Sequence, residues 1–223
     1  MTGSAGRSSP ARAAGRRSPD GASAGAVLYR PIVRGGRVIG YLWAASDTAG
    51  YLPRAGGGAD GVRAYWMRWL RVAWEGGLTP AEAMASWNPR WEFPCGTPAT
   101  GAANEIAGLR ALRALAEGTA TIDGYASETA VLVRHHPVVR DGVRLGHLWA
   151  SIDDRAAGFR PAADVPADDP AIPAWRTRLT DSAAAGLTPT QALHALRDAP
   201  DNTTIGHLTD PLGQSPMSAL HPT

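Results

Sequence analysis

The sequence contains no lysine, and all 22 of its basic residues are arginine. Together with 26 glycines and 18 prolines, this composition indicates a GC-rich coding sequence. An arginine-only set still matters for recognition, because guanidinium groups bind carboxylates and phosphates with two parallel hydrogen bonds. The formal net charge is only +2, which is too small to indicate a nucleic-acid-binding protein by itself.

Cysteine is almost absent as well, and long apolar runs are missing altogether. Cys95 is the single cysteine, which excludes a disulfide framework within the chain and a zinc site built from thiolates. No apolar run is long enough for a membrane span, and no apolar stretch follows Arg16 and Arg17, so we expect a cytoplasmic protein without a secretory signal. The common phosphate-loop, zinc-protease and hydrolase motifs do not occur, so we expect no cofactor.

The segment 1–24 lacks valine, isoleucine, leucine and aromatic residues. Such a segment cannot bury enough apolar surface to offset its chain entropy, so we predict a disordered tail. A solvated tail is the simpler interpretation of its charge, and weak contact with nucleic acid is the alternative. That alternative would use Arg7, Arg12, Arg16 and Arg17.

One phrase is written twice in the chain. "PIVRGGRVIGYLWAASD" (31–47) aligns without a gap with "PVVRDGVRLGHLWASID" (137–153), 106 positions later. With small insertions the similarity continues to "GLTP" (77–80) and "GLTP" (186–189). Order kept over more than fifty residues indicates an internal repeat rather than chance.

Each copy predicts the same series of elements. Two β-rich runs flank Gly35-Gly36 in the first copy and Asp141-Gly142 in the second, and both pairs tolerate the positive φ angles of a type I′ hairpin turn. A loop and a helix follow, at about 62–76 and 171–185. A second helix then opens with "TPAE" or "TPTQ", which is the signature of a capping box with proline at the first helical position.

These elements predict an α+β fold with two tandem copies of a β-hairpin–loop–helix–helix module, packed pseudo-symmetrically. We expect the copies to shield one another's tryptophans, either around a pseudo-two-fold axis or by joining their hairpins into one antiparallel sheet. A linking helix is expected at about 100–117. The predicted divisions are a tail (1–24), a first module (25–92), an irregular linker with a helix (93–125), a second module (126–200) and a C-terminal tail (201–223).

Tryptophans interleaved with arginines mark a candidate binding surface in the first module. Three tryptophans there have no aromatic counterpart in the second copy, and aromatic residues with arginine are typical of protein hot spots and of sites for single-stranded nucleic acid. Tyr41 and His147 occupy matching hairpin positions and complete the candidate set. The other members are Trp69, Trp74, Trp91, Arg68 and Arg71.

The histidines suggest a metal site. A regular two-residue hairpin would place His136 directly opposite His147, with Cβ atoms about 5 Å apart, so both could reach one ion. A third ligand is missing, because Asp153 lies too far along the strand. The simpler interpretation is a polar cross-strand pair.

Two further features have functional and structural interpretations. Asp47 and Asp153 end the second hairpin strands, and they fit either acid–base chemistry or, more simply, a hydrogen bond within the following loop. Cys95 is favoured as a passive thiol, since no base is tied to it by spacing.

The phrase "HPVVRDGVRLGHLWASIDD" resembles the hairpins of two families of ligand-sensing modules. GAF-like domains of transcription regulators have a similar P-V-x-x-x-G-x-x-x-G-Y-L-W phrase, and CBS modules show P-V-V-x-x-G-x-x-x-G and occur in pairs. The resemblance covers 17 to 19 residues per copy. It implies a hairpin that helps to line a pocket for a nucleotide or another small effector, and it assigns no individual functional residue.

The sequence therefore favours a non-enzymatic protein that binds a protein partner or a small effector, and it is compatible with a homo-oligomer. One alternative is a metal-dependent hydrolase that uses His136, His147 and Asp153, with the first module as a degenerate copy. A second alternative is nucleic-acid binding through the arginine-containing tail.

Overall fold

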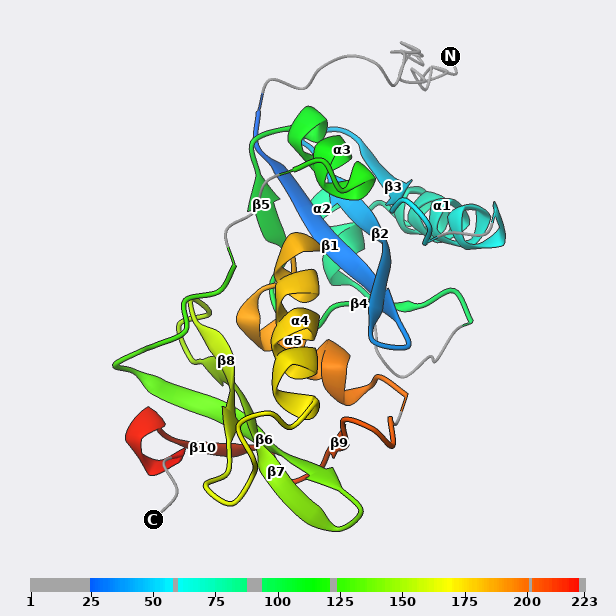
Figure 1. Ribbon diagram of the computed structural model, residues 1–223. Coiled ribbons are helices and arrows are strands. Elements are labelled where there is room, and N and C mark those ends of the chain that lie inside the picture. Colours follow the sequence, from blue (N-terminus) through cyan, green and yellow to red (C-terminus); the bar gives the residue numbers. More distant parts are fainter. Residues whose placement is uncertain (1–24, 58–59, 88–93, 121–123, 201, 221–223) are drawn as a thin grey trace, which may run out of the picture.

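The structure is a computed structural model that describes residues 25–57, 60–87, 94–120, 124–200 and 202–220 (Figure 1). These residues form two antiparallel sheets, five α-helices and one 3-10 helix, which confirms the α+β class. The predicted tail lies outside the described residues. The first half contains β1 (Val27–Arg34), β2 (Arg37–Ala44), β3 (Ala49–Pro53), α1 (Asp60–Glu75), α2 (Pro80–Ala85), β4 (Thr97–Pro98), β5 (Asn104–Ile106) and α3 (Leu109–Glu117).

The second half follows with a similar series of elements. It contains β6 (Leu132–Arg140), β7 (Val143–Ser151), β8 (Ala157–Pro161), α4 (Ala171–Ala184), α5 (Pro189–Arg197), β9 (His207–Leu208), β10 (Gly213–Pro216) and the 3-10 helix η1 (Met217–Leu220).

Both predicted hairpins are present, and each deviates from a regular ladder at the same place. Gly35-Gly36 and Asp141-Gly142 have φ angles between +52° and +78°, as a type I′ turn requires. Two residues later the register shifts in both hairpins, which leaves Ile39 and Leu145 without an opposite partner. These β-bulges move every residue beyond them by one position relative to a regular hairpin.

A third strand, which the sequence pattern predicts as loop, completes each hairpin. β3 pairs with β2, and β8 pairs with β7. Each third strand carries a glycine under a tryptophan ring of the neighbouring strand: a Cβ atom at Gly50 would lie 2.8 Å from Trp43, and one at Gly158 would lie 2.8 Å from Trp149. The glycines are therefore needed for packing, although they make the strands look like loop in the sequence.

The segments predicted as linker and C-terminal tail in part belong to the sheets. β4 and β5 both pair with β1, and β9 and β10 both pair with β6, so the two sheets have the same order of strands. The linking helix is also shorter than expected, because 104–106 forms β5 before α3 begins at Leu109.

The helices follow the prediction closely. α1 and α4 match the expected positions within about two residues, and α2 and α5 both begin with a complete capping box. Thr79 pairs with Glu82 in the first box, and Thr188 pairs with Gln191 in the second. The two boxes satisfy backbone N–H groups at the first turn that have no partner within the helix.

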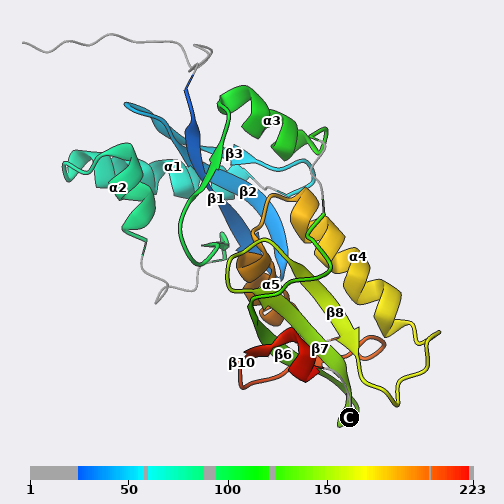
Figure 2. The same cartoon turned by 90° about the vertical axis from the view of Figure 1, so that its left-hand side faces the viewer.

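Both faces of each sheet are covered. α1 and α2 cover one face of the first sheet around the buried Trp66, and α3 covers part of the other face with Leu112 and Leu115. α4 and α5 cover one face of the second sheet around Trp175, and η1 packs Leu220 on the other. α4 and α5 consequently lie between the two sheets (Figure 1, Figure 2).

The two halves do not pack as the sequence suggests. Their hairpins belong to two separate sheets, and the turn between α4 and α5 docks on the first sheet, whereas α1 and α2 lie on the opposite face of that sheet (Figure 2). The arrangement is therefore head to tail rather than two-fold. Trp43 and Trp149 pack within their own halves, against the clusters that contain Leu112 and Leu220 respectively, so the expectation that the halves shield one another's tryptophans is wrong.

Candidate functional site

The candidate partner-binding residues of α1 divide into packed and exposed groups. Trp69 is half-buried and meets the rings of Trp66 and Trp87 edge-on at 5.9 Å, so it belongs to the first core. Trp74 is 58% exposed, and Arg68 and Arg71 are exposed as well. Trp91, the remaining candidate of this group, lies outside the described residues.

Tyr41 is not available to an external partner, because it is fully buried between the two halves. Its hydroxyl donates a hydrogen bond of 3.1 Å to the carbonyl of Ala185 at the end of α4. Tyr29 donates one of 3.1 Å to the carbonyl of Gly186, and the side-chain amide of Asn104 donates another of 2.9 Å to the same oxygen. The first sheet thus binds carbonyl groups at the C-terminal end of α4 that have no partner within the helix.

The predicted pairing of His136 with His147 is wrong, because the bulge at Leu145 shifts the register by one residue. His136 lies opposite Leu148, while His147 lies opposite Pro137, so the two imidazoles are on opposite faces of the sheet. His136 is fully buried, and its Nδ1 lies 3.0 Å from the carbonyl oxygen of Thr209. The described residues contain no group of three or more histidine, cysteine or acidic side chains that could hold a metal ion.

The same shift brings His135 next to His147, a pair that the sequence analysis misses. Their rings meet edge-on at 5.0 Å, just as the rings of Tyr29 and Tyr41 meet at 5.9 Å on the first sheet. Burial first, then His135 and Arg144, lowers the pKa of His147 to about 4, so its imidazole is neutral at pH 7. A bulge has no strong local signature, so the sequence holds no signal that would have found this pair.

Asp47, Asp153 and Cys95 form no common site. Asp153 accepts a hydrogen bond of 3.3 Å from the backbone N–H of Arg155, which is the local turn contact that the simpler interpretation describes. The backbone oxygen of Cys95 accepts a hydrogen bond of 3.2 Å from the indole of Trp66.

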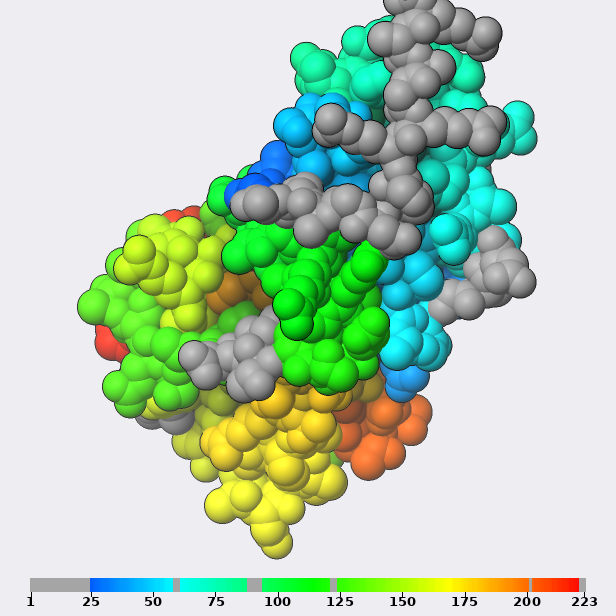
Figure 3. Space-filling view, turned by 90° about the horizontal axis from the view of Figure 1, so that it is seen from above, coloured from blue at the N-terminus to red at the C-terminus, as the bar shows by residue number. Residues whose placement is uncertain are grey.

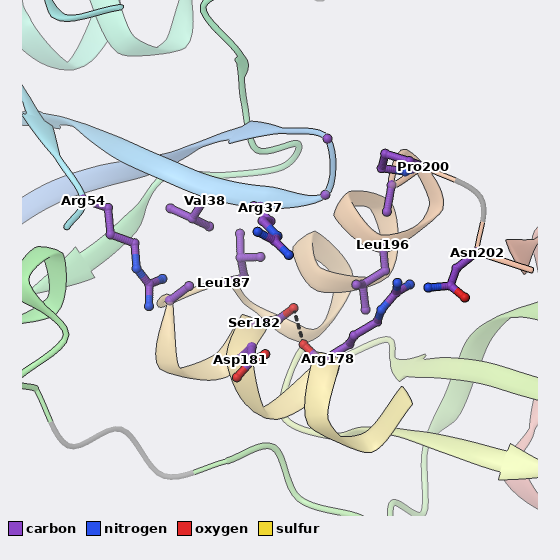
Figure 4. A pocket seen from close by; sticks show the side chains of 14 residues that line it. Arg37, Val38, Arg54, Arg178, Asp181, Ser182, Leu187, Leu196, Pro200 and Asn202 are labelled. Carbon is purple, nitrogen blue, oxygen red and sulfur yellow. Dashed lines mark hydrogen bonds between the residues drawn. The ribbon is translucent and has the colours of Figure 1, made fainter. Parts of the chain in front are cut away.

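A cleft with a volume of about 650 Å³ lies between the two halves. One wall is the tip of the β1–β2 hairpin together with Arg54, which follows β3, and the other wall is formed by α4 and α5 (Figure 4). The tip of the β1–β2 hairpin lies directly against α5 at Gly36. A Cβ atom built at Gly36 would lie 3.2 Å from the carbonyl oxygen of Ala195 and closer still to Ala199. Only a residue without a side chain allows the hairpin to approach α5 so closely.

Three arginines from three different elements line this cleft: Arg37 on β2, Arg54 after β3 and Arg178 on α4 (Figure 4). Arg178 is half-buried, and its guanidinium lies 4.9 Å from the centre of the Trp175 ring, which orients it by a cation–π contact. Burial raises the pKa of Tyr41 to about 12, and the nearby positive charge of Arg54 partly offsets this rise. Val38, Leu187 and Leu196 supply an apolar lining.

The electrostatics of the cleft favour an anion. Burial lowers the pKa of Arg178, and the positive charge of Arg37 lowers it further, which shows that the two guanidinium groups repel each other. Arg178 nevertheless stays protonated, because an arginine side chain titrates far above neutral pH. Asp181 is the one acidic side chain among the lining residues, and it is exposed.

These three arginines are not among the residues that the sequence pattern predicts for a site. At the corresponding repeat positions the other copy has Val143 for Arg37, Ala162 for Arg54 and Trp69 for Arg178. The signal that could have identified these arginines is that each one differs from its counterpart in the other copy. The same criterion selected the tryptophans Trp69, Trp74 and Trp91.

No family model, curated protein or solved structure matches the chain significantly. The resemblance to GAF-like and CBS hairpins gains no support from these comparisons. Among the helices of the described residues, none combines the length and the apolar character that a membrane span requires. The function is therefore argued from the geometry of the cleft.

Proposed function

We propose that this protein binds a small anionic molecule, carrying a carboxylate or phosphate group, in the cleft between its halves, and acts through binding rather than catalysis. The presence of Arg37, Arg54 and Arg178 in the lining of one cleft carries the proposal. Its volume of about 650 Å³ is within the range of small-molecule sites.

Each part of the cleft has a separate role in this proposal. Arg37 and Arg178 hold the anion between them, because a negative charge there relieves their mutual repulsion and accepts charge-assisted hydrogen bonds. The apolar body of the ligand rests on Leu187 and Leu196. Since the site spans both halves, a bound ligand also stabilises their contact.

The proposal includes a finer description of the fold, in which both halves are tandem copies of one module. The supporting observations are the repeat at an interval of 106 residues, the shared bulges at Ile39 and Leu145, and the same order of strands in both sheets. The cleft arginines differ between the copies, so the proposed site belongs to the junction rather than to each module.

The experiment compares ligand binding by the full chain and two pairs of variants. Inorganic phosphate, citrate and adenosine monophosphate are tested by thermal shift, and any compound that raises Tm is titrated by calorimetry. We expect Arg178→Gln and Arg37→Gln each to weaken binding at least about tenfold, since a charge-assisted hydrogen bond contributes about 1.5–3 kcal/mol. Arg71→Gln and Arg68→Gln are the controls, because both arginines are exposed on α1.

Two results would overturn the proposal. One is a wild-type Tm that none of the three anions raises. The other is an affinity that Arg178→Gln leaves unchanged or that Arg71→Gln reduces to the same extent.

A further inference from the structure

The contact between the two halves shows how one module recognises another. The turn at Ala185-Gly186, between α4 and α5, inserts its carbonyl groups against Tyr29 and Tyr41 on the first sheet. The fit is tight, because a Cβ atom at Gly186 would lie 2.7 Å from Leu115 and 2.9 Å from the hydroxyl of Tyr29.

The first half has the same turn between α1 and α2, and no other described part of the chain docks against it. Gly77 has a φ of +85° where Gly186 has +69°. The hydrogen bonds of the turn also match: the N–H of Gly77 donates to the carbonyl of Trp74 at 2.9 Å, and that of Gly186 donates to Ala183 at 2.7 Å. Gly76 and Gly77 are exposed, and no heavy atom lies within 4 Å of a Cβ atom built at Gly77.

The second half has the matching face, which is only partly covered. His135 and His147 occupy the repeat positions of Tyr29 and Tyr41, and Pro137 occupies that of Pro31. All three are half-buried, whereas the three residues of the first sheet are buried. A neutral imidazole carries one N–H donor, so His135 and His147 can each donate to a carbonyl, as the two tyrosines do.

The residues at this contact differ in size between the two copies. Ala183, which is buried beside Tyr29 and Asn104, corresponds to the 58% exposed Trp74. On the receiving face, Asn104 corresponds to Gly213, because each pairs with the first residue of the aromatic or histidine pair in its sheet. The ring of His135 fills the space at Gly213, since a Cβ atom built there would lie 2.4 Å from its Cε1. Trp74 would therefore meet an imidazole where Ala183 meets Tyr29 and Asn104.

We propose that a second copy of this chain docks its α1–α2 turn on the His135–His147 face, so that copies associate head to tail through the contact already used within the chain. α1 and α2 lie on one side of the molecule and β6 and β7 on the other (Figure 1, Figure 3), so a chain cannot satisfy both the turn and the face by itself. A contact of this heterologous kind leads to a ring when it closes and to a filament when it does not.

Sedimentation velocity over a wide concentration series tests the proposal on the full chain. Wild-type protein is expected to form species larger than dimers as its concentration rises. Trp74→Arg blocks the turn and His147→Arg blocks the face, and each is expected to raise the apparent Kd at least about tenfold, as for a hot-spot residue. Met67→Arg is the matched control on α1, because Met67 is also exposed but lies about two helical turns from the α1–α2 turn.

Mixing the two blocked variants gives the decisive result. Each variant alone stays monomeric, but their equimolar mixture retains one intact turn and one intact face, so it is expected to form a heterodimer and nothing larger. Should His147→Arg reduce the Tm, Leu212→Arg replaces it, because Leu212 is 42% exposed beside Gly213. A wild-type monomer at every concentration, self-association that neither variant weakens, or a mixture without heterodimer would each overturn the proposal.

Discussion

Gly186 and Gly77 have the same left-handed backbone conformation but very different surroundings. Both have a positive φ, which costs a residue with a side chain about 1–2 kcal/mol. A side chain at Gly186 would in addition press on Leu115 and on the hydroxyl of Tyr29, whereas one at Gly77 would meet no atom. Substitutions at Gly77 and Gly186 can therefore distinguish the cost of backbone strain from the cost of disturbed packing between the halves.

We predict that Gly77→Ala lowers the free energy of unfolding by about 1 kcal/mol and that Gly186→Ala lowers it by about 2–4 kcal/mol, because overpacking adds to backbone strain. Urea denaturation of both variants and the wild type, at a concentration where the chain is monomeric, measures the difference. Equal losses for the two variants would mean that the halves do not constrain Gly186.

The register of the second hairpin could not be predicted from the sequence, because it depends on a single bulge residue. The identity of the turn at Asp141-Gly142 was readable, but the extra residue Leu145 was not, because a bulge has no strong local signature. One unrecognised residue was enough to assign His136 instead of His135 as the neighbour of His147. Comparison of the copies does not correct this error, since both carry the same bulge.

At the scale of the element, the two capping boxes differ in one chemically important way. The carboxylate of Glu82 accepts hydrogen bonds from the backbone N–H of Thr79 at 2.8 Å and from its hydroxyl at 2.7 Å. These bonds lower the pKa of Glu82. In α5 the neutral amide of Gln191 accepts from Thr188 at 3.0 Å, so this cap does not titrate.

We predict that Glu82→Gln destabilises the protein relative to wild type at pH 7 and that this difference disappears in acid. A group whose pKa is lower in the folded state adds stability above its unfolded pKa, and this stability is lost as the pH falls through the folded value. Thermal unfolding of both proteins from pH 7 to pH 3 follows the change. A difference in stability that is the same at both ends of this range would contradict the assigned role of Glu82.

The elements with strong local signals were predictable, and those that depend on distant partners were not. Hairpins, α1, α4 and both caps follow from turn residues, helical periodicity and capping motifs. β4 and β9 have only two residues each, and they exist because the outer edge of β1 or β6 offers free backbone groups. A pattern of only two residues is too short to predict such a strand from the sequence.

At the scale of the whole molecule, the repeat in the sequence does not determine how the two halves meet. The contact depends on residues in which the copies differ: Tyr29, Tyr41 and Asn104 on the receiving sheet have His135, His147 and Gly213 as counterparts. The arginine cleft depends on such differences as well. Symmetry reasoning from the shared residues therefore led to a two-fold arrangement, while the differing residues produce a head-to-tail one.

The two carbonyl groups at this contact differ in the number of side chains that donate hydrogen bonds to them. The difference predicts how much each tyrosine contributes to holding the two halves together. Gly186 accepts from both Tyr29 and Asn104, so Tyr29→Phe leaves its carbonyl with one partner. Among the described residues Ala185 accepts only from Tyr41, so Tyr41→Phe leaves a buried carbonyl without a partner and also removes the hydroxyl that Arg54 approaches.

We predict that Tyr41→Phe lowers the free energy of unfolding by about 1–3 kcal/mol, the cost of an unsatisfied buried group, and that Tyr29→Phe lowers it by about 0.5–1.5 kcal/mol, the net value of one hydrogen bond. Urea denaturation gives both values, and hydrogen exchange read by mass spectrometry shows where the loss falls. Because the bonds of Tyr41 join the halves, peptides from α4 and from the first sheet should both lose protection in Tyr41→Phe. Loss confined to the first sheet, or a larger effect of Tyr29→Phe, would show that the halves are held together by apolar packing instead of by these carbonyl contacts.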